Sequence, residues 1–177
     1  MMEKKKIWEL GRVDAEAFSQ VEKMPLVMVV DNVRSLNNIG SIFRTADAFV
    51  VEKIVLCGIS ATPPSVEIHK TALGAEDSVE WDYSESTLRA VETLKEAGYV
   101  VCALEQVKGS VWLDKFEVDK DRKYAVIVGN EVDGVDQDVV DACHFCLEIP
   151  QFGTKHSLNV SVSAALAMWH FFKTLRL

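Results

Sequence analysis

The chain has 177 residues, of which 49% are apolar, so it is long enough to fold as one globular domain with a core of its own. No apolar run approaches the length of about 18 residues that a membrane-spanning helix needs, which argues against a membrane protein. The lysines near the N-terminus are not followed by an apolar segment, so we expect no secretory signal and a cytoplasmic location.

The formal net charge of −8 argues against a broad nucleic-acid-binding surface, because phosphate contacts need Lys and Arg. The charge is uneven along the chain: residues 1–53 carry 8 basic and 8 acidic side chains, whereas the remainder carries 11 and 19. Any contact with nucleic acid is therefore expected to be local.

The first part of the chain alternates apolar runs, typical of strands buried on both faces, with segments of helical spacing. In chain order we expect a strand over residues 26–30, a helix capped by Asn37 or Asn38 that continues to about Phe49, a strand over 53–57, a proline-containing loop over 61–65 and a short helix over 67–73.

The second part continues this alternation and predicts an α/β domain with a mostly parallel sheet covered by helices on both faces. In chain order we expect a helix from Ser84 or Ser86 to Gly98, strands over 99–104 and 123–128, a short helix over 136–143, a strand over 145–149, and a long helix over 158–175 capped by Ser157.

The last expected helix is apolar around most of its circumference, with a narrow polar stripe that includes Asn159, Ser163 and His170. A helix of this kind must be buried on more than one side. Either a second copy of the chain or other elements of the same domain would provide the second cover.

The four cysteines do not form a metal-binding pattern. Cys57 and Cys102 lie in apolar runs typical of buried strands, where a free thiol acts as a small hydrophobe. Cys143 and Cys146 form a C-x-x-C pair, but no second such pair and no matching histidine pair accompanies it. We therefore expect no metal site.

The first of three motif segments, residues 31–44, follows the first strand, at the end where ligands collect in parallel sheets. Gly40 falls in an early turn of the expected helix, where its missing Cβ indicates close approach of a backbone or a ligand. Arg44 is expected on the same side as Gly40, pointing away from the core, which suits either a functional site or an ordinary solvated arginine.

The second segment, residues 128–135, follows another expected strand and contains Gly129 and Gly134 on either side of Asn130 and Glu131. Such glycines indicate a tight turn that can hold a polar ligand with its backbone. The segment matches neither the phosphate loop nor the dinucleotide-binding pattern, and Glu131 could instead accept hydrogen bonds from a neighbouring loop.

The third segment, residues 149–161, precedes the last helix. Ser157 has a structural role there as the expected helix cap. Asn159 has no such role, because an asparagine inside a first helical turn competes with the backbone, so its amide indicates a specific partner.

Together the segments follow the patterns N-x-G-x-x-x-R, G-x-E-x-x-G and I-P-x-x-G-x-x-x-S-L-N-V, and the chain from about Leu26 onwards resembles the SpoU/TrmH-type RNA ribose 2′-O-methyltransferases of the SPOUT class. The resemblance implies a parallel α/β sheet whose C-terminal part forms a trefoil knot, a homodimer, and S-adenosyl-L-methionine as the methyl donor. It divides the chain into an N-terminal extension, residues 1–24, and a methyltransferase domain, residues 25–177.

The resemblance also implies site residues by position. Two positions depart from the family pattern: Val132 stands where glycine is common and Gln151 where methionine is usual, and Val132 bears on the geometry of the donor loop rather than on catalysis. The implied catalytic residues are Arg44, Asn38, Glu131, Ser157 and Asn159. The implied donor-binding residues are Leu104, Glu105, Gly129, Asn130, Gly134, Ile149 and Leu158.

The implied activity is methyl transfer to a ribose 2′-hydroxyl of RNA without a metal, with transfer RNA favoured over ribosomal RNA because a small dimer suits a compact substrate. The family proposal makes Arg44 the base, but a guanidinium stays protonated up to a pKa above about 12. We therefore favour a role for Arg44 in binding the adjacent phosphate, and an arginine perturbed by the nearby sulfonium is the other interpretation.

Two alternatives to this activity follow from the same residues. A noncatalytic RNA-binding or assembly protein that retains the knot would not need all five implied catalytic residues. The other alternative is a different α/β nucleotide enzyme or a signalling receiver domain, and a receiver would need an acidic cluster after the first strand, where Asp31 stands alone. The first 24 residues form either an RNA-contacting arm or a docking helix, and their candidate RNA contacts are Lys4, Lys5, Lys6, Trp8 and Arg12.

Overall fold

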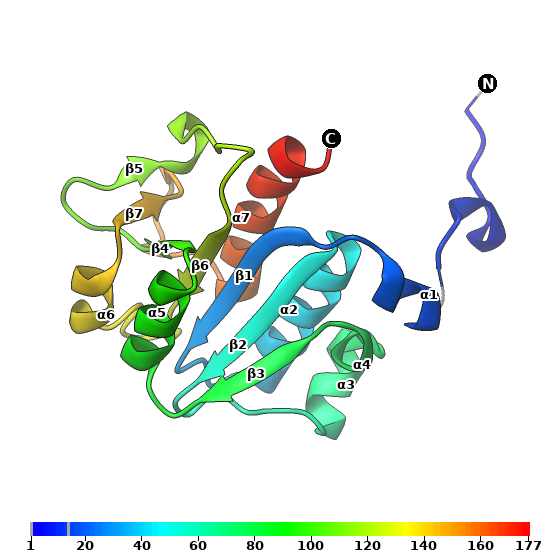
Figure 1. Cartoon of the computed structure of the whole chain (residues 1–177), viewed down its shortest axis with the longest axis horizontal. Helices are drawn as coiled ribbons and strands as arrows, with labels where there is room; N and C mark the ends of the chain where they lie inside the picture. The colour runs from blue at the N-terminus through cyan, green and yellow to red at the C-terminus, as the bar shows by residue number, and fades with distance from the viewer. Residues whose placement is uncertain (1, 14) are drawn as a thin grey trace.

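Seven strands form one sheet in the computed structural model, which describes residues 2–13 and 15–177 (Figure 1). Their order is β3-β2-β1-β6-β4-β7-β5, and every neighbouring pair is parallel, as the sequence predicted. The strands are β1 (Met24–Asp31), β2 (Val51–Cys57), β3 (Trp81–Ser84), β4 (Val100–Leu104), β5 (Val111–Trp112), β6 (Tyr124–Val128) and β7 (Phe145–Glu148).

Helices cover both faces of the sheet, in agreement with the prediction, and α5 and α6 lie on the opposite face from α2 and α7 (Figure 1). None of the helices in the described part of the chain is both long and apolar enough to cross a lipid bilayer. The helices are α1 (Ala15–Gln20), α2 (Leu36–Ala48), α3 (Val66–Ala72), α4 (Ala75–Ser78), α5 (Thr87–Glu96), α6 (Gln137–Ala142) and α7 (Val160–Leu175), with 3-10 turns η1 (Ile7–Leu10) and η2 (Leu113–Lys115).

The central strand β1 divides its side chains between two cores, because successive residues of a strand point to opposite faces. Met28 and Val30 belong to the core that includes α2 and α7, whereas Val27 and Val29 belong to the core that includes α5 and α6. This two-sided burial explains the continuous apolar run that the sequence shows there.

Two helix caps differ from the sequence prediction. Ser35, not Asn37 or Asn38, caps α2: its backbone is extended, and its side chain accepts a hydrogen bond from the Asn38 amide at 3.3 Å. Asn159, not Ser157, caps α7, and its Oδ1 accepts from the amides of Ser161 and Val162. The prediction that Asn159 lacks a structural role was therefore wrong, because the last helix begins two residues later than expected.

The close approach predicted at Gly40 is made by a neighbouring backbone. A Cβ added there would lie 2.3 Å from the Ile68 carbonyl oxygen and 2.2 Å from Thr71 Oγ1, both on α3. The glycine thus lets α3 pack directly against α2, next to the segment that carries Arg44.

The cysteines are all free thiols. Cys57 and Cys102 are buried in the sheet, and burial raises the pKa of Cys57 to about 12. Burial likewise raises the pKa of Cys143 to about 12. Among the described residues, no group of three or more His, Cys, Asp and Glu side chains is arranged to hold a metal ion.

Candidate active site

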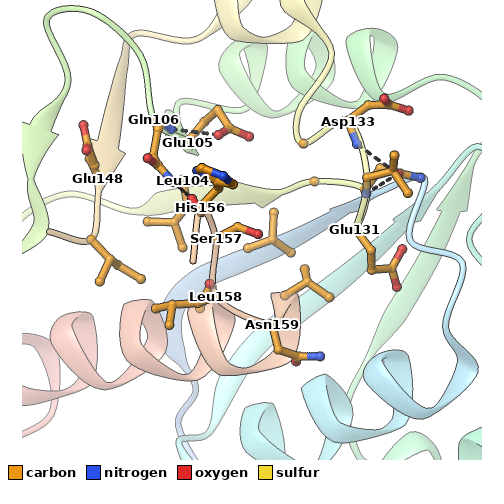
Figure 2. Close-up of a pocket in the computed structure, with 18 of the residues that line it drawn as sticks. Leu104, Glu105, Gln106, Glu131, Asp133, Glu148, His156, Ser157, Leu158 and Asn159 are labelled. Carbon is orange, nitrogen blue, oxygen red and sulfur yellow. Dashed lines mark hydrogen bonds between the residues drawn. The ribbon is translucent and has the colours of Figure 1, made fainter. Parts of the chain in front are cut away.

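A pocket of about 470 Å³ opens at the carboxyl ends of β4, β6 and β7, where three loops meet (Figure 2). In parallel sheets this edge is the usual place for a ligand. The structure brings together all the residues that the sequence predicted as donor contacts. The pocket is lined by Leu104, Glu105, Gly129, Asn130, Gly134, Ile149 and Leu158, together with residues named below.

The turn after β6 is closed by its two glycines. A Cβ added to Gly129 would lie 2.2 Å from the Gly134 carbonyl carbon, and Gly134 has a φ of +73°. The Asn130 amide donates to the Gly134 carbonyl at 2.9 Å, and the Gly134 amide donates back at 3.0 Å. Because a side chain at Gly129 would overlap this closed turn, the backbone geometry of the pocket wall depends on that glycine.

Asn130 fixes the turn to the rest of the sheet. Its Nδ2 donates to the Asn32 carbonyl at 2.7 Å, and its Oδ1 accepts from the Val132 amide at 2.8 Å. Among the described residues with a side chain, Val132 is not one of those with a positive φ. The departure from the family pattern at Val132 therefore does not strain the turn.

Glu131 joins the second motif to the first. Its carboxylate accepts hydrogen bonds from the Arg34 and Ser35 amides, both at 3.0 Å, and from Asn38 Nδ2 at 3.1 Å. Partial burial alone would raise the pKa of Glu131, but these hydrogen bonds outweigh it and hold the pKa below its ordinary value. The carboxylate is therefore ionised at neutral pH and orders the start of α2.

The third motif joins the same network. Asn159 Nδ2 donates to Asn38 Oδ1 at 3.1 Å, so Glu131, Asn38 and Asn159 form a continuous polar chain across three loops. Ser157 lines the pocket beside Asn159 (Figure 2). Four of the five residues predicted as catalytic are thus brought together.

Arg44 is the exception. It is exposed and lines a different hollow, of about 500 Å³, formed by α2, the corner between α3 and α4, and the N-terminal segment. It does not line the pocket that contains Glu131 and Asn159. Within one copy of the chain, the predicted catalytic arginine therefore lines a different hollow from the predicted donor contacts.

The pocket is acidic, since Glu105, Glu131, Asp133 and Glu148 line it and none of the described lining residues is Lys or Arg. The Glu105 carboxylate is itself held by the Val135 amide at 3.0 Å and the Gln106 amide at 2.8 Å. An acidic lining favours a cationic ligand over one that presents phosphate groups.

Gln106, Glu148 and Ser163 also line the pocket, although they lie outside the site residues and motif segments predicted from the sequence. Gln106 Nε2 donates to the His156 carbonyl at 2.7 Å, which ties the loop after β4 to the loop before α7. Gln106 and Glu148 both lie at the carboxyl ends of strands, and this position was the available signal for them.

Comparison with known proteins finds relatives of this chain by sequence. Residues 25–169 match the model of the SpoU rRNA Methylase family. A relative from Staphylococcus saprophyticus, whose name places it in the TrmH family of tRNA/rRNA methyltransferases, is 29% identical over 152 residues, which is 86% of this chain and 60% of the relative. The chain thus spans about three-fifths of the length of this relative.

Solved structures share the fold. An AdoMet-bound rRNA methyltransferase from Sinorhizobium meliloti has a TM-score of 0.79 at 24% identity, covering 89% of this chain and 60% of that one. A structure that concerns the 2-OH methylation of C/U34 on tRNA has a TM-score of 0.75 at 22% identity, covering 85% of this chain and 95% of that one. At these identities the likeness establishes the arrangement of strands and helices.

Proposed function

Because the chain belongs to the SpoU rRNA methylase family, we propose that it is an S-adenosylmethionine-dependent methyltransferase that modifies a ribose 2′-hydroxyl of RNA. The observation that carries the proposal is the pocket itself. All seven implied donor contacts line it, and the polar chain of Glu131, Asn38 and Asn159 lies at its side.

The pocket suits this donor in size and charge. Its volume of about 470 Å³ lies within the range of roughly 300–1,000 Å³ that is usual for small-molecule sites. Its acidic lining complements a ligand that carries a sulfonium and an ammonium group. Leu104, Ile149 and Leu158 supply apolar surface for the uncharged part of the donor.

S-adenosylmethionine supplies a methyl group that is already activated, so the protein must align the ribose oxygen and allow its proton to leave. Asn38 and Asn159 present amide groups at the side of the pocket, held in place by Glu131. Arg44 binds the phosphate next to the target ribose, because its guanidinium stays protonated and cannot act as an ordinary base. The proton then passes to that phosphate or to water.

The proposal includes a homodimer. Val162, Leu166 and Trp169 are exposed along one side of α7, and Trp169 retains 44% of its accessible surface. A second copy that covers this stripe would bury it and give α7 the second cover that its sequence predicts. Since Arg44 lies apart from the pocket of its own copy, we assign each pocket the partner subunit's Arg44.

The remaining parts of the proposal follow from the family. They are the trefoil knot in the C-terminal part and the division into an extension over residues 1–24 and a methyltransferase domain over 25–177. Transfer RNA is the favoured substrate, because a small dimer suits a compact RNA, and ribosomal RNA is the second candidate. The relative from Staphylococcus saprophyticus carries both in its name.

Two measurements test the proposal. Titration calorimetry of the whole chain with S-adenosylmethionine should give one donor bound per chain, whereas a noncatalytic RNA-binding protein need not bind donor at all. Mapping of 2′-O-methyl groups in RNA from cells with and without the gene should reveal at least one mark that disappears. A protein that binds no donor, or a gene whose loss removes no mark, would refute the assignment.

A further inference from the structure

The first described residues form a basic segment on an acidic protein. We name residues 2–13 the N-terminal arm; it contains Lys4, Lys5, Lys6 and Arg12 against Glu3 and Glu9, whereas the whole chain has a net charge of −8. Figure 1 shows the arm extending away from the sheet, beyond α1. A local positive patch of this kind is the electrostatic signature of a contact with a polyanion.

The arm is anchored at its base. Phe18 of α1 is buried, and Lys23 Nζ donates to the Phe18 carbonyl at 2.6 Å. The two interpretations of this segment therefore apply to different parts of it: α1 docks on the domain, whereas the arm before it remains exposed.

Arg12 of the arm and Arg44 of α2 line the same hollow, although 31 residues lie between them in sequence. Neither guanidinium forms an ion pair or hydrogen bond with any of the residues that the structure describes. The hollow also contains Asp47, whose carboxylate accepts a hydrogen bond from Ser78 Oγ at 2.8 Å. The two guanidiniums, which have no partner among the described residues, and the Asp47 carboxylate leave a net positive charge at this site of about 500 Å³, which suits the single negative charge of a backbone phosphate.

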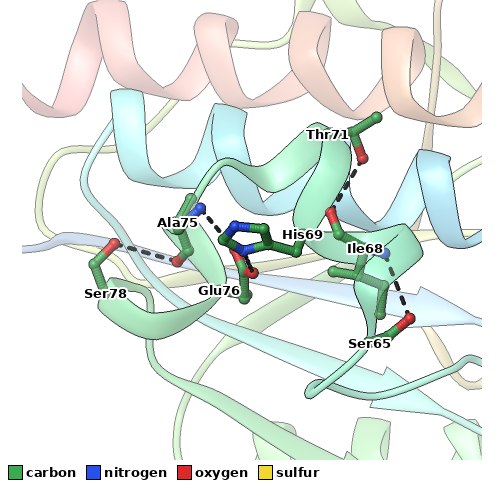
Figure 3. Close-up of polar contacts among 8 residues, drawn as sticks. Ser65, Ile68, His69, Thr71, Ala75, Glu76 and Ser78 are labelled. Atoms are coloured by element: carbon green, nitrogen blue, oxygen red, sulfur yellow. Dashed lines mark hydrogen bonds and ion pairs between the residues drawn. The ribbon is translucent and has the colours of Figure 1, made fainter.

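The opposite wall of the hollow is held in place by polar contacts (Figure 3). The corner between α3 and α4 passes through Leu73 and Gly74, both with positive φ. The buried Glu76 carboxylate accepts from the Gly74 amide at 3.0 Å and lies 2.5 Å from His69 Nδ1. The α3–α4 corner that lines the hollow is thus held in place by these contacts.

The arm also carries an exposed indole. Trp8 keeps 77% of its accessible surface, and Lys6 Nζ lies 5.2 Å from the centre of its ring. Proteins bind single-stranded RNA by stacking aromatic rings on its bases and by placing cationic side chains on its backbone.

We propose that the N-terminal arm and Arg44 form one RNA-binding surface, in which Arg12 and Arg44 share a backbone phosphate in the hollow and Trp8 stacks on an unpaired base of the same strand. The inference rests on the proposed function, since it takes Arg44 as the residue next to the target ribose. The arm provides an acidic protein with a local RNA-binding site and positions the bound strand near Arg44. It therefore supplies substrate affinity that the donor pocket cannot.

The test compares charge reversals at opposite ends of the sheet. Lys4→Glu/Lys5→Glu removes the positive charge of the arm, and the matched control Lys108→Glu/Lys115→Glu makes the same change in net charge at the β5 edge. Binding of unfractionated tRNA and of a single-stranded RNA oligonucleotide is measured across a salt series, and S-adenosylmethionine affinity is measured by calorimetry.

We expect the arm variant to weaken RNA binding at least tenfold and the control to weaken it less than threefold, with donor affinity unchanged in both. Arg12→Ala should lower the slope of log RNA affinity against log salt concentration by about the amount that corresponds to one phosphate contact. Trp8→Ala should weaken binding of the oligonucleotide about fivefold or more, and Trp8→Phe should restore most of it.

The outcomes separate the inference from the proposed function. A wild-type protein that binds RNA and donor, with arm and control variants equally affected, would overturn the inference and leave the methyltransferase assignment standing. A wild-type protein that binds neither RNA probe would also overturn it. Loss of donor binding in the wild type would refute the proposed function instead, whatever the arm does.

Discussion

The donor pocket and the arginine hollow differ in how they are built and in their charge. The pocket is acidic, and its loops are fastened to one another by hydrogen bonds through Glu131, Asn130 and Gln106. The hollow contains two guanidiniums that have no partner among the described residues. The loops of the pocket are held together within a single copy, whereas the two guanidiniums of the hollow remain available to a ligand. We propose that this division separates binding of a cationic donor from binding of a polyanionic substrate.

The largest expected effect comes from Gly129→Ala, which would break the pocket and spare the hollow. The added Cβ would lie 2.2 Å from the Gly134 backbone, so the turn after β6 must open. We expect donor affinity to fall at least a hundredfold, while RNA affinity stays within about twofold. Calorimetry and RNA binding on the same preparation check this.

A matched glycine substitution sharpens this result. A Cβ added to Gly153, in the loop before α7, would meet nothing within 4 Å, so Gly153→Ala should leave donor affinity nearly unchanged. Equal loss in both variants would mean that backbone flexibility, rather than the closed turn, determines donor binding.

Substitutions of Arg44 should have the opposite pattern. Arg44→Ala should abolish nearly all methylation while donor affinity is retained, because Arg44 does not line the pocket. Arg44→Lys should retain a little activity, since it keeps a cation for the phosphate. Single-turnover methylation assays measure both variants. Equal abolition by the two substitutions, with RNA affinity unchanged, would argue against the phosphate-binding role.

Asn159 has both a structural and a site role, and two variants separate them. Asn159→Ala removes the cap of α7 and should cost about 0.5–2 kcal/mol of unfolding free energy. Asn159→Asp keeps a capping oxygen but places a carboxylate opposite Asn38 Oδ1, so stability should be retained while methylation falls. Chemical denaturation measures the stability, with Ser157→Ala as the control, because Ser157 does not cap the helix.

The smallest expected effect is a pH dependence at Glu131. Its pKa in the folded protein lies below its ordinary value, so the stability it contributes is fully present above that ordinary value and is lost as pH falls through the lowered pKa. Glu131→Gln has one acceptor oxygen for the Arg34 and Ser35 amides. The difference in melting temperature between wild type and variant should therefore be constant near pH 7 and shrink in acid. A difference independent of pH down to about 3 would contradict this.

Structural features that depend on short stretches of sequence could be predicted from the sequence alone. The apolar run in β1 and the paired glycines around Asn130 have few structural solutions, so the buried strand and the tight turn were predicted correctly. The edge strands β3 and β5 were missed because they are short and only partly buried or exposed.

What the sequence could not supply was placement across long separations. Ser35 and Asn159 cap their helices because the chain turns there. Residue preferences alone placed these caps two or three residues away from their actual positions. That Arg12 lines the same hollow as Arg44 depends on how α1 docks, and Phe18 of α1 is buried in this docking. Motif spacing likewise grouped Arg44 with Glu131, whereas in the folded chain the two residues line different hollows.

The most direct test of the central claim is complementation between the two regions. Chains carrying Arg44→Ala are co-expressed with chains carrying Gly129→Ala, each inactive alone. If the pocket of one copy uses the partner subunit's Arg44, half of the randomly assembled dimers are mixed and each has one intact site, so methylation should recover to about a quarter of the wild-type level. A mixture that stays as inactive as either variant alone would contradict the account.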